Sequence, residues 1–446
     1  MKQISFAFLL TILVCSVPAQ TTKSLVLLTG TVRNFNNQVE VEDMSELKDL
    51  LLPDTERFFV PDAEGHFRIQ FSLTAPNYFR IGRNIVYLSP GDSLIMLVDY
   101  KDPKLATFSG KHSKENEYLR ETPFPKGGSF LDAGGEIRST LDSTVMAVEL
   151  AGQKRTQSLQ GYTGLSKEFV QLETARIRAD ILNSFTDIRI YFPYMRKLSK
   201  DSADAFHKNF VQQMAPYMDR YNKNFIDPAF LKLAVYRNVI DELPAGNKDN
   251  DKQLQQVKDW ITARNLAQEI KKASDRESKL KLGTQVNAIT SQPYKAALQN
   301  TMEKVLQLSN GDPAVEFTAI DNAGAAKKLT SQKGKLIYID IWATWCGPCL
   351  EEMPAYEKLK ASYKDNPNIS FISLSIDDDK DAWKQNMKKR DAQGFQWIID
   401  RAKLSAYNII GIPRSILVNQ NFAIVEMNAA LPSSKTITQK LDELLK

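Results

Sequence analysis

Residues 336–349, LIYIDIWATWCGPC, constrain the fold of this chain more than any other stretch. The run LIYIDIW has the length of a strand, and an apolar run with a single acid is typical of a strand buried on both faces. Cys346-Gly347-Pro348-Cys349 follows at once, and Pro348 suits the first turn of a helix, where a backbone N–H is not needed. The sequence therefore predicts a buried strand that leads directly into a helix carrying two cysteines.

The rest of the segment from Asn310 to Lys446 alternates strand and helix patterns. The expected elements are the helix from about Cys346 into the 360s, a second buried strand at 371–376, a helix at 380–390, a hairpin at 415–418 and 423–427, and a last helix at 435–446. Buried strands joined by helices predict an α/β domain at 310–446 whose sheet is mostly parallel or mixed and covered on both faces.

The spacing of Cys346 and Cys349 favours thiol–disulfide exchange. A helix N-terminus stabilises a thiolate, so Cys346 is predicted to be the exposed nucleophile and Cys349 the buried resolving cysteine. The two would form a redox disulfide and release substrate through a mixed disulfide. A purely stapling role is disfavoured, because linking residues so close in sequence removes little unfolded-state entropy. An inert cysteine or half of a zinc site is the alternative.

Neither a metal nor a cofactor is predicted. The three histidines, His66, His112 and His207, are scattered, and no second Cys-x-x-Cys accompanies the first. The acidic run Asp377-Asp378-Asp379 is typical of a metal cluster at first sight, but a solvated loop that caps the following helix is favoured.

The stretch IDIWATWCGPC resembles the active-site segment of thioredoxins. The wider pattern, from GDPAVEFTAIDNAG through KGKLIYIDIWATWCGPCLEEMP to GIPRSILVN, is similar to the exported TlpA/ResA-like thiol–disulfide oxidoreductases of the thioredoxin superfamily. This resemblance covers about residues 310–446 and implies a thioredoxin-like fold. The front half resembles the β-plus-helical part attached to such domains in Bacteroidetes-type proteins.

The resemblance also assigns a role to Asp340, where thioredoxins keep a buried carboxylate. An acid within the apolar run 336–341 should have a raised pKa because burial disfavours its charged form. It would then accept the proton of Cys349 as that thiol attacks. The alternative is a strand-end carboxylate bonded to backbone or water. Thioredoxins place a lysine beside this acid, and the matching position here is Ser373, which leaves the proton-transfer environment open.

Pro413 matches the cis-proline that faces the cysteines in this fold, with a simple trans turn as the alternative. Ile412, which precedes it, would offer its backbone to a bound substrate. Trp345, Gly347 and Pro348 complete the predicted substrate-binding set.

The front of the chain carries two other patterns. Phe67, Ile69, Phe71 and Leu73 alternate along one strand, which predicts an all-β, sandwich-like domain at 20–112. Apolar residues then recur at helical spacing, as in SKEFVQLETARIRADIL, and predict a helical domain at 113–309. Three domains agree with a length of 446 residues, which exceeds what one core usually covers.

The first residues predict export. Lys2, the apolar run 6–14 and the small residues Val17-Pro18-Ala19 indicate a signal peptide at 1–19, and hence a periplasmic or cell-envelope protein. Two alternatives remain: a transmembrane anchor, for which the run is short, and a lipid on Cys15, which the preceding Val14 disfavours. Removal of the leader would leave Cys346 and Cys349 as the only cysteines.

These features favour an enzyme that reduces disulfides in exported proteins and is recharged by a membrane thiol carrier. The formal charge of +5 and the lack of a basic stripe give no reason to expect nucleic acid as a partner. A peroxiredoxin is disfavoured, because Ile339 and Ala343 occupy the proline and threonine positions of its Pro-x-x-x-Thr-x-x-Cys pattern. A redox-sensing binding or assembly protein is the non-enzymatic alternative. The sequence specifies neither the substrate nor the oligomeric state.

Overall fold

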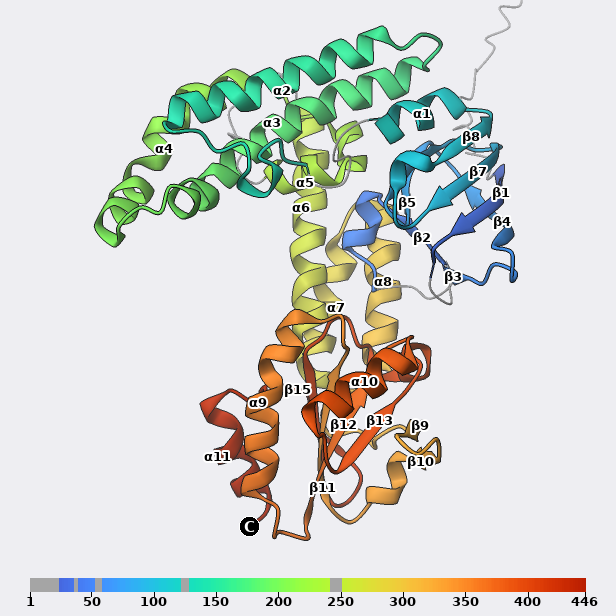
Figure 1. The fold of residues 1–446 in the computed structure, drawn as a ribbon, viewed down its shortest axis with the longest axis vertical. Helices are drawn as coiled ribbons and strands as arrows, with labels where there is room; N and C mark the ends of the chain where they lie inside the picture. The colour runs from blue at the N-terminus through green and yellow to red at the C-terminus, as the bar shows by residue number, and fades with distance from the viewer. Residues whose placement is uncertain (1–23, 36–38, 53–57, 122–127, 241–250) are drawn as a thin grey trace, which may run out of the picture.

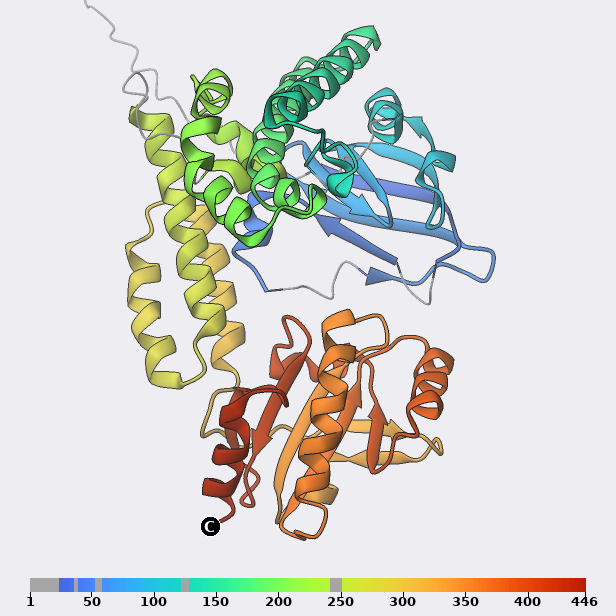
Figure 2. The same ribbon diagram turned by 60° about the vertical axis from the view of Figure 1, so that its left-hand side comes forward.

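The computed structural model describes residues 24–35, 39–52, 58–121, 128–240 and 251–446. The signal peptide predicted at 1–19, including Cys15, lies outside the described residues. Three parts follow one another along the chain: a strand-rich part, a helical part and an α/β part (Figure 1). Figures 1 and 2 show α6, α7 and α8 as a column that leads from the upper helices down to the α/β part.

The strand-rich part contains two four-stranded sheets, in the orders β4-β1-β7-β8 and β3-β2-β5-β6. Its strands are β1 Ser24–Arg33, β2 Val39–Asp43, β3 Phe58–Phe59, β4 His66–Leu73, β5 Asn77–Ile81, β6 Asn84–Leu88, β7 Ser93–Asp99 and β8 Thr107–Gly110. Both sheets contribute to one apolar core, to which β4 adds Phe67, Ile69, Phe71 and Leu73 from a single face. The predicted alternation of β4 is confirmed.

The helical part covers one side of these sheets with α1 and continues away from them. Its helices are α1 Ser113–Glu121, α2 Leu141–Gly161, α3 Lys167–Met195, α4 Lys200–Asn222, α5 Ala234–Val239, α6 Asp251–Lys272, α7 Arg276–Ala288 and α8 Gln292–Leu306. The apolar positions predicted for α3 all lie in its buried face, from Phe169 through Leu172 to Leu182. In the described part of the chain, no helix has the length and apolar character needed to cross a bilayer.

A buried charged cluster joins the strand-rich part to the helices. Arg155 of α2 and Glu173, Arg176 and Asp180 of α3 are each at most 5 % exposed. Arg155 pairs with Asp180, and Arg176 pairs with Glu173 at 3.1 Å. Tyr78 of β5 donates its hydroxyl to Glu173 at 2.9 Å, so the cluster includes a side chain from the sheet. Such pairs specify one arrangement rather than add much stability, because burying charges is costly.

The α/β part confirms the elements expected from the sequence to within two residues at each end. Its mixed sheet has the order β10-β9-β13-β12-β11-β14-β15. The strands are β9 Thr318–Asp321, β10 Ala326–Lys328, β11 Leu336–Trp342, β12 Ile369–Ser375, β13 Phe395–Ile398, β14 Arg414–Val418 and β15 Ile424–Ala429. The helices are α9 Gly347–Ser362, α10 Lys380–Arg390 and α11 Lys435–Leu444.

The central strand β11 is buried along its whole length because helices cover both faces of the sheet. Leu336 and Tyr338 share a core with residues of α9 and α11. Ile337 and Ile339 share a second core with residues of α10. β11 pairs in parallel with β12 and antiparallel with β14, which places the carboxyl ends of β11 and β12 at one edge of the sheet.

The α/β part is attached to the helical column through the segment that precedes β14. Ile410 packs into an apolar core formed by α6, α7, α8 and Leu50. Asn408 Nδ2 donates to the carbonyl of Lys304, at the end of α8, at 2.8 Å. Nearby, a cleft of about 800 Å³ is bordered by β2, α6, Arg401 and Ile410, so all three parts meet there.

We expect Tyr78→Phe to destabilise the full chain by about 1.5–3 kcal/mol, because it removes a hydrogen bond to a buried carboxylate. Tyr217 provides a matched control, since its hydroxyl donates to Asp142 at the same distance, 2.9 Å, but in an exposed setting. Tyr217→Phe should cost less, because water can replace the lost bond to an exposed carboxylate. Urea unfolding of both variants measures the difference, and equal losses would contradict a special role for the buried contact.

Candidate active site

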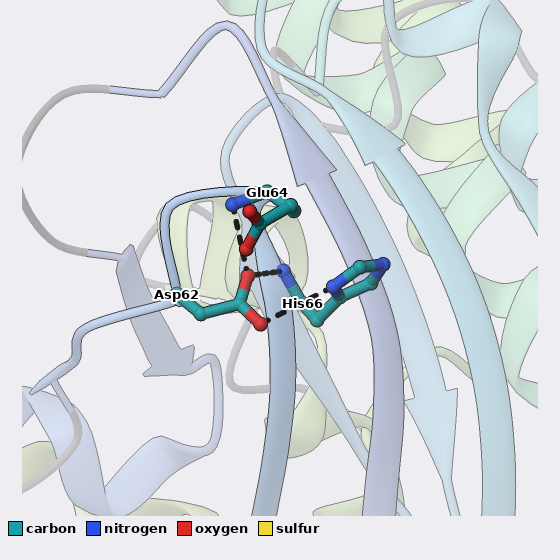
Figure 3. Close-up of side chains that lie close together, drawn as sticks. All are labelled: Asp62, Glu64 and His66. Atoms are coloured by element: carbon teal, nitrogen blue, oxygen red, sulfur yellow. Dashed lines mark hydrogen bonds and ion pairs between the residues drawn. The ribbon is translucent and has the colours of Figure 1, made fainter.

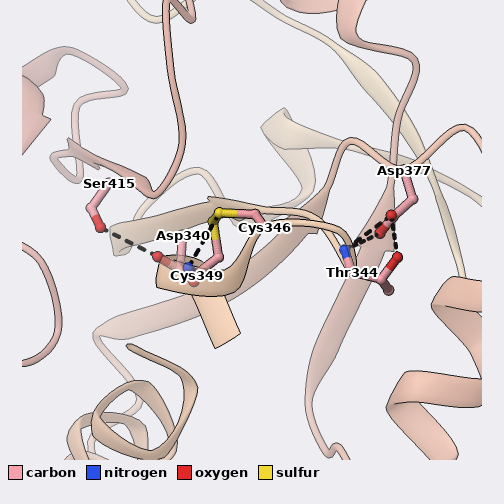
Figure 4. Close-up of a disulfide and its surroundings, with 6 residues drawn as sticks. All are labelled: Asp340, Thr344, Cys346, Cys349, Asp377 and Ser415. Carbon is pink, nitrogen blue, oxygen red and sulfur yellow. Dashed lines mark hydrogen bonds between the residues drawn. A yellow bond between two sulfur atoms is a disulfide. The ribbon is translucent and has the colours of Figure 1, made fainter. Parts of the chain in front are cut away.

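The two predicted cysteines lie at the start of α9, where β11 ends, and their sulfur atoms form a disulfide (Figure 4). Cys346 is the N-cap residue of α9, so the free N–H groups of the first turn point toward it. The N–H of Cys349 donates to Cys346 Sγ at 3.2 Å. A donor at that position favours a thiolate on Cys346 once the disulfide is reduced.

The prediction that Cys346 is exposed is wrong. Its exposed fraction is 6 %, against 1 % for Cys349, so both are buried and Cys346 is only the outer of the two. Cys346 is a small side chain in the same apolar core as Trp342 and Met353, and these larger residues account for its burial. Trp345, by contrast, is 64 % exposed.

The predicted substrate-binding residues lie around this disulfide. Trp345, Gly347 and Pro348 are exposed on the loop and first turn that hold the cysteines. Ile412 packs against the apolar core that contains both cysteines, and the Ile412–Pro413 peptide bond is cis, which confirms that expectation over the trans alternative. The structure thus brings the two segments to one place, while their contacts with substrate stay a prediction.

Asp340 is 1 % exposed in the middle of β11, so it is not at a strand end. Burial raises the pKa of Asp340 from its ordinary value of 3.8 to about 7, and the negative charge of Glu352 adds to this rise. Ser415 Oγ of β14 donates to Asp340 Oδ1 at 3.4 Å and in turn accepts from Tyr338 Oη at 2.8 Å. A carboxyl group whose pKa lies near neutrality is suited to accept and return a proton.

Ser373 lies directly opposite Asp340 in the parallel pairing of β11 with β12. It is 1 % exposed, and its hydroxyl has no hydrogen-bond partner among the described residues. The position next to the buried acid is therefore neutral, as the sequence indicated.

Asp377 is a further candidate that sequence reasoning missed, because it was predicted to be solvated. It is 5 % exposed and accepts the N–H of Thr344 at 3.0 Å and the hydroxyl of Thr344 at 2.6 Å (Figure 4). It also accepts the hydroxyl of Ser375 at 2.6 Å. These bonds hold the loop between β11 and Cys346. The available signal was position: Asp377 follows a buried strand whose carboxyl end meets that loop.

The other predicted role of this acidic run is confirmed. Asp379 caps α10 by accepting from the N–H groups of Asp381 and Ala382, each at 2.9 Å. Two residues of the run therefore have different roles: Asp377 holds the cysteine loop, and Asp379 caps the start of α10.

One group of possible metal ligands occurs within the described ranges, namely Asp62, Glu64 and His66 (Figure 3). All three are exposed, and Asp62 Oδ1 already accepts the N–H groups of Glu64 at 3.1 Å and His66 at 2.7 Å. This geometry is that of a side-chain-stabilised turn before β4. We assign no metal to it.

Comparison with known proteins places the similarity in the C-terminal third. Residues 309–441 match the family model described as Redoxin. The thiol-disulfide oxidoreductase ResA of one Bacillus cereus strain is 31 % identical over 118 residues, 26 % of this chain and 67 % of that protein. The thioredoxin-like protein YneN of Bacillus subtilis (strain 168) is 29 % identical over 147 residues, 32 % of this chain and 85 % of that protein.

Among solved structures, a crystal structure of a candidate thiol-disulfide oxidoreductase from Bacteroides vulgatus is 37 % identical. The match covers 31 % of this chain and 98 % of that one, with a TM-score of 0.30.

We expect Asp377→Asn to slow the reaction of reduced Cys346 with iodoacetamide and to lower stability by about 2 kcal/mol, because buried bonds to a charged acceptor are lost. Asp379→Asn is the matched control in the same acidic run, and asparagine caps helices about as well as aspartate. Mass-mapped labelling of both variants checks this. An unchanged labelling rate in Asp377→Asn would show that the loop does not need the contact.

We expect Asp340→Asn to increase the free energy of unfolding of the oxidised protein, relative to the wild type, by more at pH 8 than at pH 4. Because the folded pKa of Asp340 is raised to about 7, the native state keeps its proton between pH 3.8 and 7 while the unfolded state releases it. Wild-type stability should therefore fall as pH rises through this window, by about 4 kcal/mol for a rise of about three units. Urea unfolding at pH 4, 6 and 8 measures this, and a pH-independent difference would contradict it.

Proposed function

The chain belongs to the TlpA/ResA-like thiol–disulfide oxidoreductases of the thioredoxin superfamily, and on that premise we propose that it reduces disulfide bonds in exported proteins. The observation that carries the proposal is the pairing of a helix-capping dithiol with a buried acid. Cys346 Sγ accepts the N–H of Cys349, and the pKa of Asp340 is about 7.

The proposed reaction transfers two electrons to the substrate. The thiolate of Cys346 attacks one sulfur of a substrate disulfide, that S–S bond breaks, and a mixed disulfide forms while one substrate thiolate leaves. Cys349 then loses its proton to Asp340 and attacks Cys346 Sγ, which releases the second substrate thiolate. The enzyme ends oxidised as the Cys346–Cys349 disulfide, and the proton on Asp340 is returned to a thiolate.

Substrate would bind over the exposed face of this pair. Trp345 offers a large apolar side chain beside Cys346, and Gly347 and Pro348 leave the approach open. Ile412, ahead of Pro413, would pair its backbone with an extended substrate segment. These roles follow from the family likeness and from the position of the residues next to the sulfurs.

The direction of the reaction follows from the residues between the cysteines. Gly347-Pro348 matches the dipeptide of thioredoxin, whose potential is about −270 mV, whereas the oxidant DsbA lies near −120 mV. A strong reductant that works outside the cytoplasm must be recharged after each turnover. We infer that a membrane thiol carrier supplies the electrons.

The remaining parts of the proposal concern location and organisation. The leader pattern at 1–19 supports export to the periplasm or cell envelope. The shared core of the two front sheets supports a sandwich-like domain at 20–112, followed by a helical domain at 113–309 and the redox domain at 310–446. The domain boundaries are proposals.

A redox sensor is the second candidate function. The segment before Ile412 is anchored to α8 by Asn408 and to the helical core by Ile410, so a change at the dithiol has a direct route to the front parts. A peroxidase is disfavoured, because Ile339 and Ala343 are buried apolar residues where that chemistry requires proline and threonine.

We expect the purified, reduced protein to turn over insulin disulfides with dithiothreitol as donor, and Cys346→Ser to abolish turnover. Asp340→Asn should lower the rate of the resolving step by about 10²–10⁴-fold, because a positioned proton acceptor is lost. Turbidity and single-turnover kinetics measure these effects.

Binding of a partner that changes with redox state, without turnover, would favour the sensor. A potential above about −180 mV in a glutathione titration would instead indicate an oxidase or isomerase.

A further inference from the structure

Asp340 is surrounded by few charges. Tyr338 lies two residues away on its own strand, Glu352 and Tyr356 face it from α9, and Arg390 faces it from α10. The position opposite on β12 is neutral, and β14 contributes only the hydroxyl of Ser415. Among the groups of the described chain that act on Asp340, Arg390 is the positive one.

Arg390 is held in place by contacts to two other elements. Its guanidinium lies over the ring of Trp342, 4.9 Å from the centroid, and Nη1 lies 3.3 Å from Met353 Sδ of α9. Nε donates to Asn386 of its own helix at 2.7 Å. Trp342 is two residues beyond Asp340 on β11, so both point to the same face of the sheet. The guanidinium therefore covers the side chain that follows Asp340 on this face of β11, at the end of the strand that leads to the cysteines.

Arg390 forms no ion pair with a carboxylate of the described residues, and its buried Nη2 has no hydrogen-bond partner among them. The hydroxyls of Tyr356 and Ser373 are buried and unpaired in the same sense. Buried donors and acceptors without partners are rare, because they lose hydration without compensation. The carboxylate of Glu357 on α9 acts on Arg390 through its charge, as Asp340 does. Arg390 thus brings a cation and a spare donor to the polar region between α9, α10 and β12.

We propose that Arg390 is a positioning residue for the buried acid: its charge acts on Asp340 from α10 and sets the pH at which Asp340 takes the proton of Cys349. This rests on the proposed role of Asp340 as proton acceptor. The cation stabilises the carboxylate and so partly offsets burial, whereas Glu352 acts in the opposite sense. Burial lowers the pKa of Arg390, but arginine stays charged at any pH where the dithiol reacts.

The test follows the second half of one turnover. Reduced protein reacts with one equivalent of 5,5′-dithiobis(2-nitrobenzoate). Attack by Cys346 releases the first nitrothiobenzoate and leaves the second in a mixed disulfide, and attack by Cys349 on Cys346 Sγ then releases the second. We expect Arg390→Met to move the pH midpoint of the second release upward by about one unit. Arg390→Lys, which keeps the charge, should retain a midpoint near that of the wild type.

Lys389→Met is the matched control, because it removes one positive charge from the exposed neighbouring position of the same helix. Its midpoint should equal the wild-type value. A midpoint in Arg390→Met that does not move, with the rate lowered equally at every pH, would overturn the proposal and leave Arg390 a packing residue. If Arg390→Met does not fold, Arg390→Gln serves as the neutral variant, and infrared titration of the Asp340 carboxyl group in Arg390→Gln and Arg390→Lys gives the same comparison.

Asp340→Asn separates this inference from the proposed function. If it leaves the pH profile of the second release unchanged, the proton-acceptor role of Asp340 fails and the inference fails with it. If it flattens the profile while Arg390→Met leaves the midpoint in place, only the inference fails.

Discussion

The burial of Asp340 in the central strand is the constraint on which the rest of the site depends. A carboxyl group next to the dithiol can accept and return a proton only if its pKa lies near neutral pH. Raising the pKa of an aspartate that far requires burial almost free of water. The strand must therefore be covered on both faces, and helices α9, α10 and α11 provide that cover. An apolar residue at position 340 would make the fold more stable, but it could not accept a proton.

The edge of the sheet adds the second element of the site. Parallel strands β11 and β12 end side by side, so a polar residue after one strand reaches the loop after the other. Asp377 uses this geometry to hold Thr344 from both its backbone and its side chain. The loop then delivers Cys346 to the first turn of α9, where the N–H of Cys349 meets its sulfur. Strand pairing, the hydrogen bonds of Asp377 and the N-cap of α9 together fix the position of Cys346.

The front parts are not a detached appendage. The segment that leads to Ile412 and Pro413 is bonded to the end of α8 and packed into the core of the helical column. The column is in turn bonded to the segment that follows β2: Trp260 Nε1 of α6 donates to the carbonyl of Glu46 at 3.3 Å, and Thr301 Oγ1 of α8 donates to that of Leu50 at 2.8 Å. A continuous set of packed elements therefore connects the strand-rich part with one wall of the dithiol site, which gives the long front half a physical relation to the chemistry.

The sequence by itself determined the elements that carry the site, the two cysteines and the burial of Asp340, whereas strands β9, β10 and β13 were not predicted. These depend on patterns within a few residues: an apolar run of strand length, a proline in the first turn after the N-cap, and helical or alternating periodicity. Local order along the chain was therefore enough to predict β11, α9 and the acid between them, and also the neutral position at Ser373. What periodicity did not reveal was how much side chains elsewhere would cover Cys346.

Only the tertiary structure decided which distant side chains contact Asp340, Asp377 and Arg390. Ser415 reaches Asp340 from 75 residues away, and Thr344 reaches Asp377 across 33. Arg390 of α10 lies over the ring of Trp342 in β11, 4.9 Å from its centroid. Only its position directly after a buried strand sets Asp377 apart from its two acidic neighbours, and nothing in the local sequence distinguishes Arg390 from Lys389 beside it. Their surroundings, and hence their electrostatic effect, are set by which distant segments the fold packs against them.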